Sequence, residues 1–298
     1  MINLAKSAIA PVLGQRVPLR GPARLLNRSY AKAGWRPGDS EKRLTSSLGD
    51  DFYIDLSSFL EWQIWAFGSY ERHLSELFRY LIKPADRCID VGANIGVHTI
   101  RLSKLVGARG EVIAIEPDEE LVRRCSKNLL LNRLTNVRLI QAAASERGAE
   151  NVLLYRPEAR DSNKARASLL PHAYLTGSAA RVPAVRIDDV NDGPVTLIKI
   201  DVEGHEAAVV SGAANTIETY FPSIIFEYAT ELLGSESCSP FKWLHERGYE
   251  MFAIRQARNH FSGRESLELE YLHALSGNAH NILAILKSMV PQVTSLVR

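Results

Sequence analysis

The chain has 298 residues, 46% of them hydrophobic and 23% charged, with a formal net charge of +2. This length suits one large α/β domain with appendages or two small domains, and the composition is ordinary for a globular protein. So small a net charge does not by itself predict a nucleic-acid partner, and no run of 18 apolar residues predicts a transmembrane helix. The three cysteines, which form no close pair, argue against a disulfide framework or a zinc site: Cys88, Cys125 and Cys238.

The amino-terminal segment is basic. No acid precedes Asp39, whereas seven basic residues do: Lys6, Arg16, Arg20, Arg24, Arg28, Lys32 and Arg36. After Pro22, a helix from Ala23 to Lys32 would place three of them on one face. Three interpretations stay open, namely a solvated basic arm, a helix that binds a membrane surface or an anionic partner, and a transit peptide. We therefore treat residues 1–50 as a basic extension outside the fold.

Two helices are expected before the first sheet strand, within residues 52–84. Residues 37–51 suggest a polar connection, and Phe52 to Leu56 a short strand. Ser58 and Glu61 have the spacing of a capping box, which predicts a helix that Gly68 ends. Leucines and Phe78 at helical spacing predict a second helix from about Tyr70 to Pro84. Both helices should pack beside the sheet. Four aromatic residues are expected in the core, with a wall facing the substrate as the alternative: Trp62, Trp65, Phe67 and Tyr70.

The most informative stretch is Arg87 to His98. Its apolar run ends in Asp90-Val-Gly-Ala-Asn-Ile-Gly96, which predicts a buried parallel strand, a tight loop and a helix. In open α/β sheets, ligands bind at the carboxyl ends of the strands. The spacing from Gly92 to Gly96 lacks the middle glycine of a dinucleotide loop. An acid at Asp90 would repel a pyrophosphate but suits the cationic end of S-adenosylmethionine (SAM), so the loop favours SAM over NAD.

A second strand, Val112 to Glu116, also ends in an acid. A carboxylate there can accept hydrogen bonds from the two ribose hydroxyls of a nucleoside. The third strand, Val137 to Gln141, leads into the small residues Ala142 to Ser145, against which an adenine could lie. Asp118 is expected to cap the helix that follows the second strand.

The second half of the domain repeats this pattern. Val152 to Tyr155 and Val182 to Ile187 are predicted strands, and the basic segment 156–181 between them suggests a lid. The strand after Thr196 delivers Asp201, followed by Glu203 and His205, and the strand Ser223 to Glu227 ends in another acid. Neighbouring strands would gather these groups on one rim with Asp90 and Glu116, which packing alone does not explain. A structural hydrogen-bond network is the alternative.

Alternating strands and helices indicate a mostly parallel sheet. A helix from Phe241 should end at Gly248. Tyr249 to Arg255 and Asn281 to Leu286 are expected to form a terminal antiparallel pair, joined by a charged loop around residues 263–270. Residues 287–298 are expected to be a tail.

Five motifs in this order resemble those of FkbM-type methyltransferases. They are Asp90 to Gly96, Glu116-Pro117, Asn128-Leu-Leu-Leu-Asn132, Ile198 to Glu206, and Pro222 to Glu227. The similarity also takes in Gly68-Ser-Tyr-Glu71 and Asn281 to Ile285, and it covers roughly residues 55–286. It leaves residues 1–50 outside and sets the methyltransferase domain at residues 51–286.

The resemblance implies an α/β, Rossmann-like class I methyltransferase with a seven-stranded, mostly parallel sheet, flanking helices and an amino-terminal helical extension. Such enzymes use SAM to methylate a hydroxyl oxygen of secondary metabolites or of sugars in glycans and glycolipids. By position, the methionine part of SAM would be surrounded by Asp90, Gly92, Asn94 and Gly96. Glu116 would bind the ribose and Ala143 to Ser145 would lie on the adenine side, while Asp201, Glu203 and His205 would face the acceptor.

The acceptor hydroxyl must lose its proton, and His205 or Asp201 could take it. Alternatively, Asp201 and Glu227 could hold a divalent ion that acidifies the hydroxyl. Other function classes also remain: a nicotinamide enzyme, a nucleic-acid methyltransferase, and a non-catalytic SAM-binding module that docks on membranes. We expect a cytoplasmic protein, and the basic amino terminus could place it at the periphery of an anionic membrane.

Overall fold

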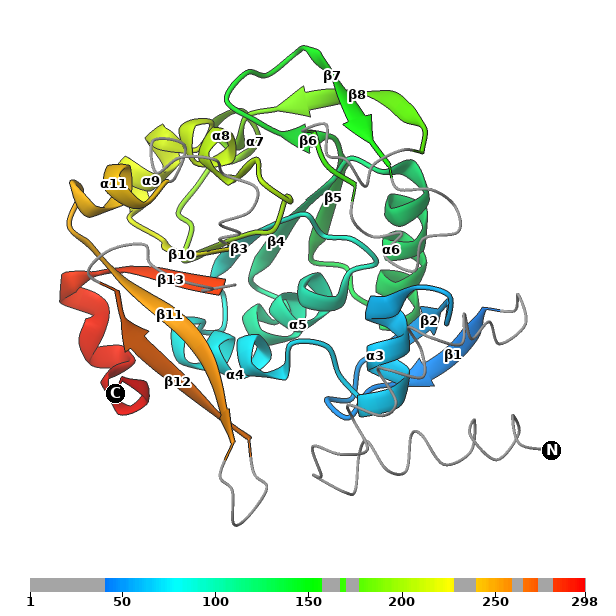
Figure 1. Ribbon diagram of the computed structural model, residues 1–298, viewed down its shortest axis with the longest axis horizontal. Helices are drawn as coiled ribbons and strands as arrows, with labels where there is room; N and C mark the ends of the chain where they lie inside the picture. Colours follow the sequence, from blue (N-terminus) through cyan, green and yellow to red (C-terminus); the bar gives the residue numbers. More distant parts are fainter. Residues whose placement is uncertain are drawn as a thin grey trace.

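A computed structural model describes residues 41–156, 167–169, 177–227, 240–258, 265–272 and 281–297. Within this part of the chain, the centre is an eight-stranded sheet in the order β12-β11-β13-β10-β9-β3-β4-β5 (Figure 1). Neighbouring strands from β10 to β5 run parallel, whereas β13 is antiparallel to both β10 and β11. The bounds are β3 Arg87–Val91, β4 Glu111–Glu116, β5 Val137–Gln141, β9 Leu197–Ile200, β10 Ser223–Glu227, β11 Tyr249–Arg258, β12 Glu265–Tyr271 and β13 Asn281–Leu286.

The Rossmann-like class and the mostly parallel sheet are confirmed, but the sheet has eight strands instead of seven. The extra strand is β12, which pairs antiparallel with β11 at the sheet edge. We expected a charged loop around residues 263–270 instead. Leu267 and Leu269 alternate with Glu268 and Glu270, and both leucines are buried. This two-residue period, which is typical of a strand with one buried face, outweighs the charge.

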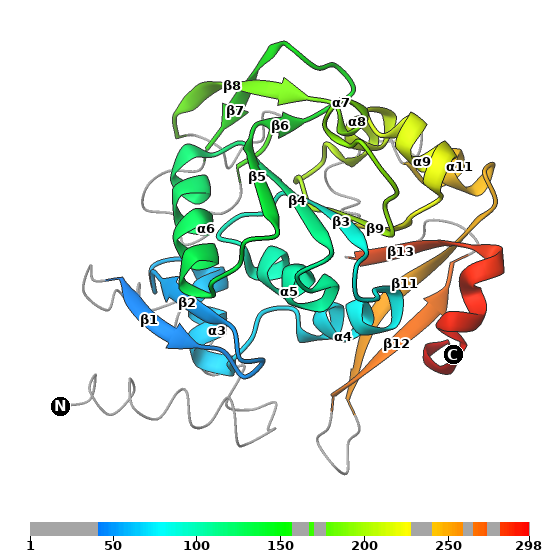
Figure 2. The same cartoon turned by 180° about the vertical axis from the view of Figure 1, so that it is seen from behind.

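Helices cover both faces of the sheet (Figure 1, Figure 2). One face packs against α4 (Arg72–Leu81) and α5 (Val97–Val106) through one apolar cluster. The opposite face packs against α7 (Ile187–Val190), α8 (Glu206–Ser211), α9 (Ala214–Tyr220) and α11 (Pro240–His245). Alternate residues of each strand point to opposite faces, so Cys88 joins the first cluster and Ile89 the second. The buried strands therefore read as continuous apolar runs, which is why the sequence located them well.

A smaller three-stranded sheet lies beyond the carboxyl end of β5 (Figure 1). It consists of β6 (Ala143–Ala144), β8 (Ala179–Val185) and β7 (Asn151–Tyr155), in that order. The two longer strands correspond to the predicted strands on either side of the basic segment. The expected lid falls mostly on residues outside the described part of the chain, as do the basic residues before position 41 and Cys238.

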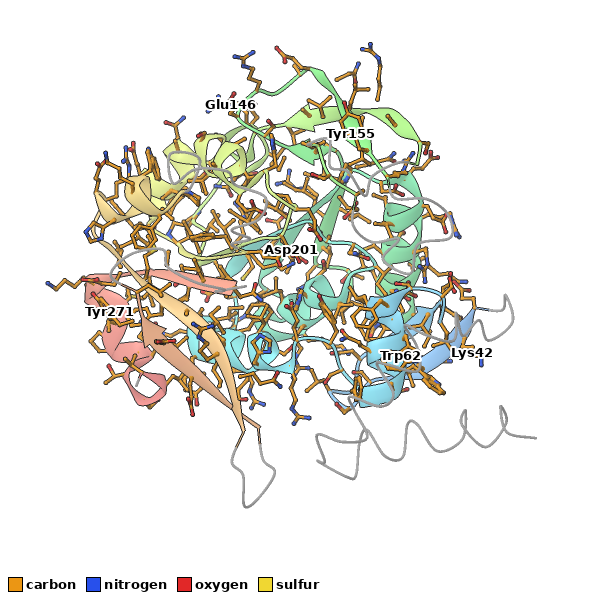
Figure 3. All side chains as sticks on the ribbon, in the orientation of Figure 1. Lys42, Trp62, Glu146, Tyr155, Asp201 and Tyr271 are labelled. Atoms are coloured by element: carbon orange, nitrogen blue, oxygen red, sulfur yellow. The ribbon has the colours of Figure 1, made fainter. Side chains whose placement is uncertain are left out.

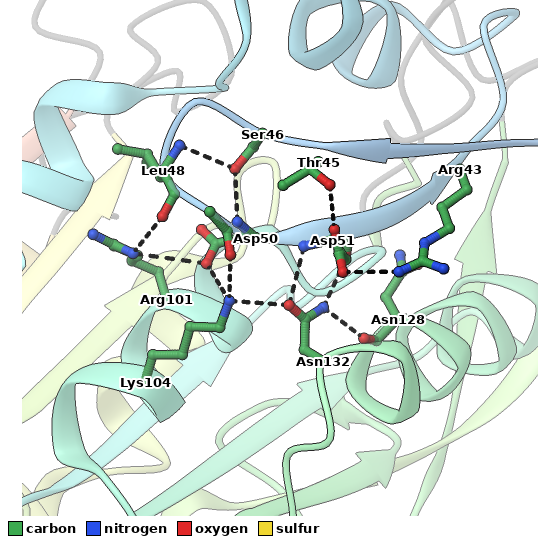
Figure 4. Close-up of polar contacts among 11 residues, drawn as sticks. Arg43, Thr45, Ser46, Leu48, Asp50, Asp51, Arg101, Lys104, Asn128 and Asn132 are labelled. Atoms are coloured by element: carbon green, nitrogen blue, oxygen red, sulfur yellow. Dashed lines mark hydrogen bonds and ion pairs between the residues drawn. The ribbon is translucent and has the colours of Figure 1, made fainter.

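The amino-terminal part of the described chain forms a hairpin of β1 (Lys42–Thr45) and β2 (Asp51–Ile54). β2 agrees with the short strand predicted from Phe52 to Leu56, whereas β1 lies where the sequence suggested a polar connection. Two asparagines hold this hairpin: Asn128 of α6 (Glu119–Leu131) and Asn132, the C-cap residue of that helix. Figure 4 shows the bonds of Asn132 to Asp51. Asn128 accepts a hydrogen bond from the Tyr53 amide at 2.7 Å, and Asn132 bonds both the amide and the carbonyl of Asp51. The Asn128-to-Asn132 motif therefore attaches β2 to the domain.

The helix α3 (Phe59–Phe67) ends at Gly68 as expected, but the predicted capping box is wrong. Ser58 is the N-cap residue without a side-chain capping bond. Glu61 instead accepts a hydrogen bond from the Asp55 amide and forms a buried ion pair with Arg124 of α6. Trp62 is buried and packs on the ring of Phe67, in agreement with the predicted core role.

The residues after Leu286 form two short 3-10 helices, η2 (Lys287–Gln292) and η3 (Thr294–Leu296), where a tail was expected. Val293 and Leu296 are buried in the same apolar cluster as Leu267 and Leu269 of β12. None of the helices in the described ranges is long and apolar enough to cross a membrane.

Candidate functional site

Four adjacent parallel strands end at one edge of the sheet, and an acid stands at or just after the end of each. Asp90 and Glu116 belong to β3 and β4, Asp201 follows β9, and Glu227 ends β10. The shared strand direction brings these ends to one edge, where α/β sheets bind ligands. Asp201 lies near the middle of the molecule in this view (Figure 3). The predicted rim therefore exists as a geometric feature.

Asp90 is fully buried, and its two oxygens differ. Thr99 of α5 donates a hydrogen bond to Oδ2 at 2.6 Å, which ties the strand end to the helix that follows it. Oδ1 has no hydrogen-bond partner among the described residues, and the Lys199 ammonium lies 3.7 Å away. This orphan acceptor fits a ligand ammonium group.

The loop from Gly92 to Gly96 packs directly on the end of β9. Gly92 and Gly96 have φ values of +80° and +90°, and Asn94 between them has φ 52°. A Cβ on Gly92 would lie 1.9 Å from the carbonyl oxygen of Asp201. Glycine at position 92 therefore lets the ends of β3 and β9 approach each other.

Glu116 is held by the backbone of two loops. Its Oε2 accepts a hydrogen bond from the Asn94 amide at 2.8 Å, and Oε1 accepts one from the Asp118 amide at 3.0 Å. Burial raises the pKa of Glu116 to about 7, although these two bonds oppose the rise. Each carboxylate oxygen keeps a second lone pair, so the group is fixed in place and still able to accept from ribose hydroxyls. Asp118 caps α6 as predicted.

The expected adenine-side residues lie beside His205. Ala143 and Ser145 are buried next to β8, and the Ser145 hydroxyl lies 3.0 Å from Nε2 of His205. Burial lowers the pKa of His205, which favours the neutral imidazole. His205 thus has a hydrogen-bond partner among the residues expected on the adenine side, and that bond occupies one of its two ring nitrogens.

Asp201 and Glu203 stand on the turn between β9 and α8. The Lys199 ammonium donates a hydrogen bond to Oδ2 of Asp201 at 3.1 Å. Glu203 has φ 50°, a left-handed backbone that is costly for a side chain with a Cβ. Its carbonyl accepts a hydrogen bond from the buried Ser168 hydroxyl at 2.9 Å. Non-glycine residues in this conformation concentrate at functional sites, so the turn has the character of one.

Two further carboxyl groups stand close to Asp201. Burial raises the pKa of Glu206 to about 7, opposed by backbone amides that include Gly204. Burial also raises the pKa of Glu227 far above its usual range, and the charges of Asp201 and Glu203 add to this rise. These shifts indicate a crowded acidic site in which some carboxyl groups are protonated at neutral pH.

The structure adds residues that the sequence argument did not assign. Glu71, which has φ 41°, bonds Nε2 of His98 at 3.0 Å and the side chain of Asn281 at 3.1 Å. Burial alone would raise the pKa of Glu71, but His98 and Lys199 hold it at about 2. Tyr70 lies near enough to Glu71 and Asp201 for their charges, after burial, to raise its pKa.

Two sequence signals could have pointed to Lys199 and to Glu71. One is a lysine at position 199 inside a strand that is otherwise apolar, because a lone buried ammonium is costly. The other is the Gly68-to-Glu71 segment, which entered only through the family resemblance.

Asp90, Glu116 and the loop between them suit SAM better than a metal. The Asp90 oxygen without a hydrogen-bond partner fits the ammonium of SAM, and the fixed Glu116 carboxylate fits its ribose. The small residues Ala143 and Ala144 fit the adenine. Among the described residues, no group of three or more histidines, cysteines, aspartates and glutamates is arranged to hold a metal ion.

A family model described as the methyltransferase FkbM domain matches residues 90–251. The FkbM methyltransferase from Methylobacillus flagellatus KT is similar in structure, with 16% sequence identity, 70% of this chain and 50% of that chain covered, and a TM-score of 0.44. A SAM-dependent O-methyltransferase from Thermotoga maritima has 15% identity, covers 83% of this chain and 78% of its own, and has a TM-score of 0.43. No curated protein sequence matches the chain.

Proposed function

The chain belongs to the FkbM methyltransferase family and is a SAM-dependent methyltransferase, and from this premise we propose that it methylates a hydroxyl oxygen. The acceptor is a sugar, a glycan or a secondary metabolite. Asp201 carries this proposal, because a carboxylate held by Lys199 stands where the β9 end meets the glycine loop.

Bound SAM supplies an electrophilic methyl group on a positively charged sulfur. Asp90 and Glu116 would hold its methionine and ribose parts, and the backbone of Gly92, Asn94 and Gly96 would shape the loop around it. Holding the acceptor oxygen close and in line supplies much of the rate in such a displacement. The chain's main tasks are therefore binding, orientation and exclusion of water.

Removal of the acceptor proton falls to Asp201, Glu203 or His205. Asp201 is the first choice, because Lys199 binds only its Oδ2 and a general base needs a free lone pair within reach of the hydroxyl. His205 would remain neutral and able to act, but its Nε2 is engaged by Ser145. Glu203 and His205 then serve to orient the acceptor hydroxyl.

A sugar-like acceptor suits this site better than a nucleic acid. The rim gathers Glu71, Asp201, Glu203, Glu206 and Glu227 within mutual electrostatic range. Phosphates would be repelled there, whereas hydroxyl groups find many acceptors.

The test uses the purified full-length chain with SAM labelled with carbon-13 in its methyl group. A panel of monosaccharides and glycosides serves as acceptors, and carbon NMR distinguishes O-methyl from N-methyl and C-methyl products. We expect an O-methyl product whose rate falls at least about 100-fold in Asp201→Asn. The exposed control Glu150→Gln should keep the wild-type rate. Methylation of nitrogen or carbon alone would contradict the proposal.

We also propose that residues 51–286 hold the catalytic site, with β1 and the two 3-10 helices after Leu286 packed on the same domain, and that the basic amino-terminal residues hold this domain at an anionic membrane surface. The seven basic residues and the absence of acids before Asp39 support this attraction. Sedimentation with phosphatidylserine vesicles should be lost on deletion of residues 1–36. Equal sedimentation of both forms would contradict it.

A further inference from the structure

Lys199 is a buried cation inside the central sheet. It is the third residue of β9, a strand whose four residues are all buried, and only 3% of its surface is exposed. Burying an ammonium costs several kcal/mol unless opposite charges surround it. Packing alone therefore does not explain a lysine at this position, whereas its charged partners do.

The lysine is placed by strand geometry. Asp201 lies two residues further along the chain, so both side chains point to the same face. Asp90 of β3 is directly opposite Lys199 in the parallel pairing. The ammonium consequently lies 3.1 Å from Oδ2 of Asp201 and 3.7 Å from Oδ1 of Asp90. It stands between the cofactor side and the acceptor side of the site.

The other charged groups around this point are mostly anionic. Glu71, beside α4 and bonded to His98 of α5, acts on the charge of Lys199. Around Asp201 lie Glu203, Glu206 and Glu227, together with Tyr70. Burial opposes the charged ammonium, but the carboxylates of Asp201, Asp90 and Glu71 outweigh it and raise the pKa of Lys199. Lys199 is therefore a permanent cation at working pH.

We propose that Lys199 is a positioning residue for methyl transfer, whose ammonium orients Asp201 through Oδ2 and compensates the charge of the adjacent Asp90 and Asp201 carboxylates. The inference rests on the proposed function of Asp201 as the base. The ammonium of Lys199 and the carboxylates of Asp90 and Asp201 together carry a net charge of −1. This leaves one negative charge to favour the sulfonium, and it leaves Oδ1 of Asp201 to face the acceptor.

Removal of the cation has a specific consequence. In Lys199→Met, two carboxylates would face each other without compensation, and one of them would take up a proton near neutral pH. Binding the sulfonium of SAM would displace that proton, whereas S-adenosylhomocysteine (SAH), which lacks the sulfonium charge, would displace less of it. In the double variant Lys199→Met/Asp201→Asn the net charge of the site returns to −1, and the effect should vanish.

The experiment is isothermal titration of the full-length protein with SAM and with SAH at pH 7.5, in buffers of different ionisation enthalpy, which gives the number of protons released. The proteins are the wild type, Lys199→Met, the double variant, and Lys242→Met, whose side chain on α11 is 86% exposed. Lys199→Met should release up to about one proton more with SAM than with SAH. The wild type, the double variant and Lys242→Met should share one lower value.

Equal proton release by Lys199→Met and the wild type would overturn the proposal. If Lys199→Met does not fold, the proposal requires that the double variant folds. A double variant that fails to fold, although Asp201→Asn folds, would also overturn the proposal. Urea unfolding from pH 6 to 9 provides a measurement that needs no ligand. The free energy of unfolding should fall more steeply with rising pH in Lys199→Met than in the other three proteins. Failure to methylate a hydroxyl would count against the proposed function and leave these results intact.

Discussion

At the scale of single residues, the site depends on backbone that only certain residues tolerate. Gly92 has a positive φ and faces the carbonyl of Asp201, while Glu71, Asn94 and Glu203 adopt left-handed backbone in spite of their side chains. Hydrogen bonds fix Glu71 and the Asn94 amide, which offsets the strain. The site is therefore organised by close contacts between loops as much as by its carboxylates.

The first prediction concerns Gly92→Ala, with Gly49→Ala as the matched control. Both glycines have φ near +80°, but a Cβ on Gly49 meets nothing within 4 Å, whereas one on Gly92 would overlap Asp201. Gly49→Ala should cost about 1–2 kcal/mol for the backbone alone. Gly92→Ala should cost more and also weaken SAH binding at least about 10-fold, because the end of β9 must move. Urea unfolding measures the free energy of unfolding, and calorimetry measures the affinity for SAH. Equal effects of Gly92→Ala and Gly49→Ala would contradict the prediction.

At the scale of elements, the β1–β2 hairpin is joined to the domain through α6. Asn128 is fully buried and uses both ends of its amide, accepting from the Tyr53 amide and donating to the Ile95 carbonyl. Ile95 belongs to the glycine loop. The same side chain thus fixes the hairpin on one side and the loop of the candidate SAM site on the other.

The second prediction follows from this double role. Asn128→Ala leaves the buried Ile95 carbonyl and the half-buried Tyr53 amide without their side-chain partner and should lower the free energy of unfolding by about 2–3 kcal/mol. Hydrogen exchange at the Tyr53 amide should become faster. Asn215→Ala, an exposed asparagine on α9, should change stability by no more than about 0.5 kcal/mol. Unchanged exchange at Tyr53 would show that the hairpin is held by other contacts.

Prediction from sequence succeeded where a pattern is local. Apolar runs identified β3, β4, β9 and β10, and the acids after them identified the rim. It failed where a distant partner decides the structure, because Glu61 pairs with Arg124, Asn128 bonds Tyr53, and Glu71 bonds His98 and Asn281. Separations of 27 to 210 residues leave no local pattern for those bonds. The roles of Asp201, Glu203 and His205 stay predictions for the same reason, since an acceptor must define them.

At the scale of the whole molecule, the sheet concentrates carboxyl groups whose pKa values are raised by burial. Glu116 and Glu206 have values of about 7, and that of Glu227 is higher than its usual range. A carboxyl group with a raised pKa binds more protons in the folded protein than in the unfolded chain. Stability from such groups is fully present below the unfolded pKa and is lost as the pH rises through the folded value.

The third prediction is therefore that the free energy of unfolding falls as the pH rises from 5 to 7, the range in which Glu116 and Glu206 titrate in the folded protein. Glu206→Gln mimics the protonated carboxyl and should reduce this fall by on the order of 2 kcal/mol. Glu150→Gln, at an exposed position, should leave the fall unchanged. Urea unfolding at pH 5, 6 and 7 provides the measurement. A free energy of unfolding that rises over this pH range would contradict the prediction. It would show that cations, and not bound protons, compensate the acids at the sheet edge, as Lys199 does for Asp90 and Asp201.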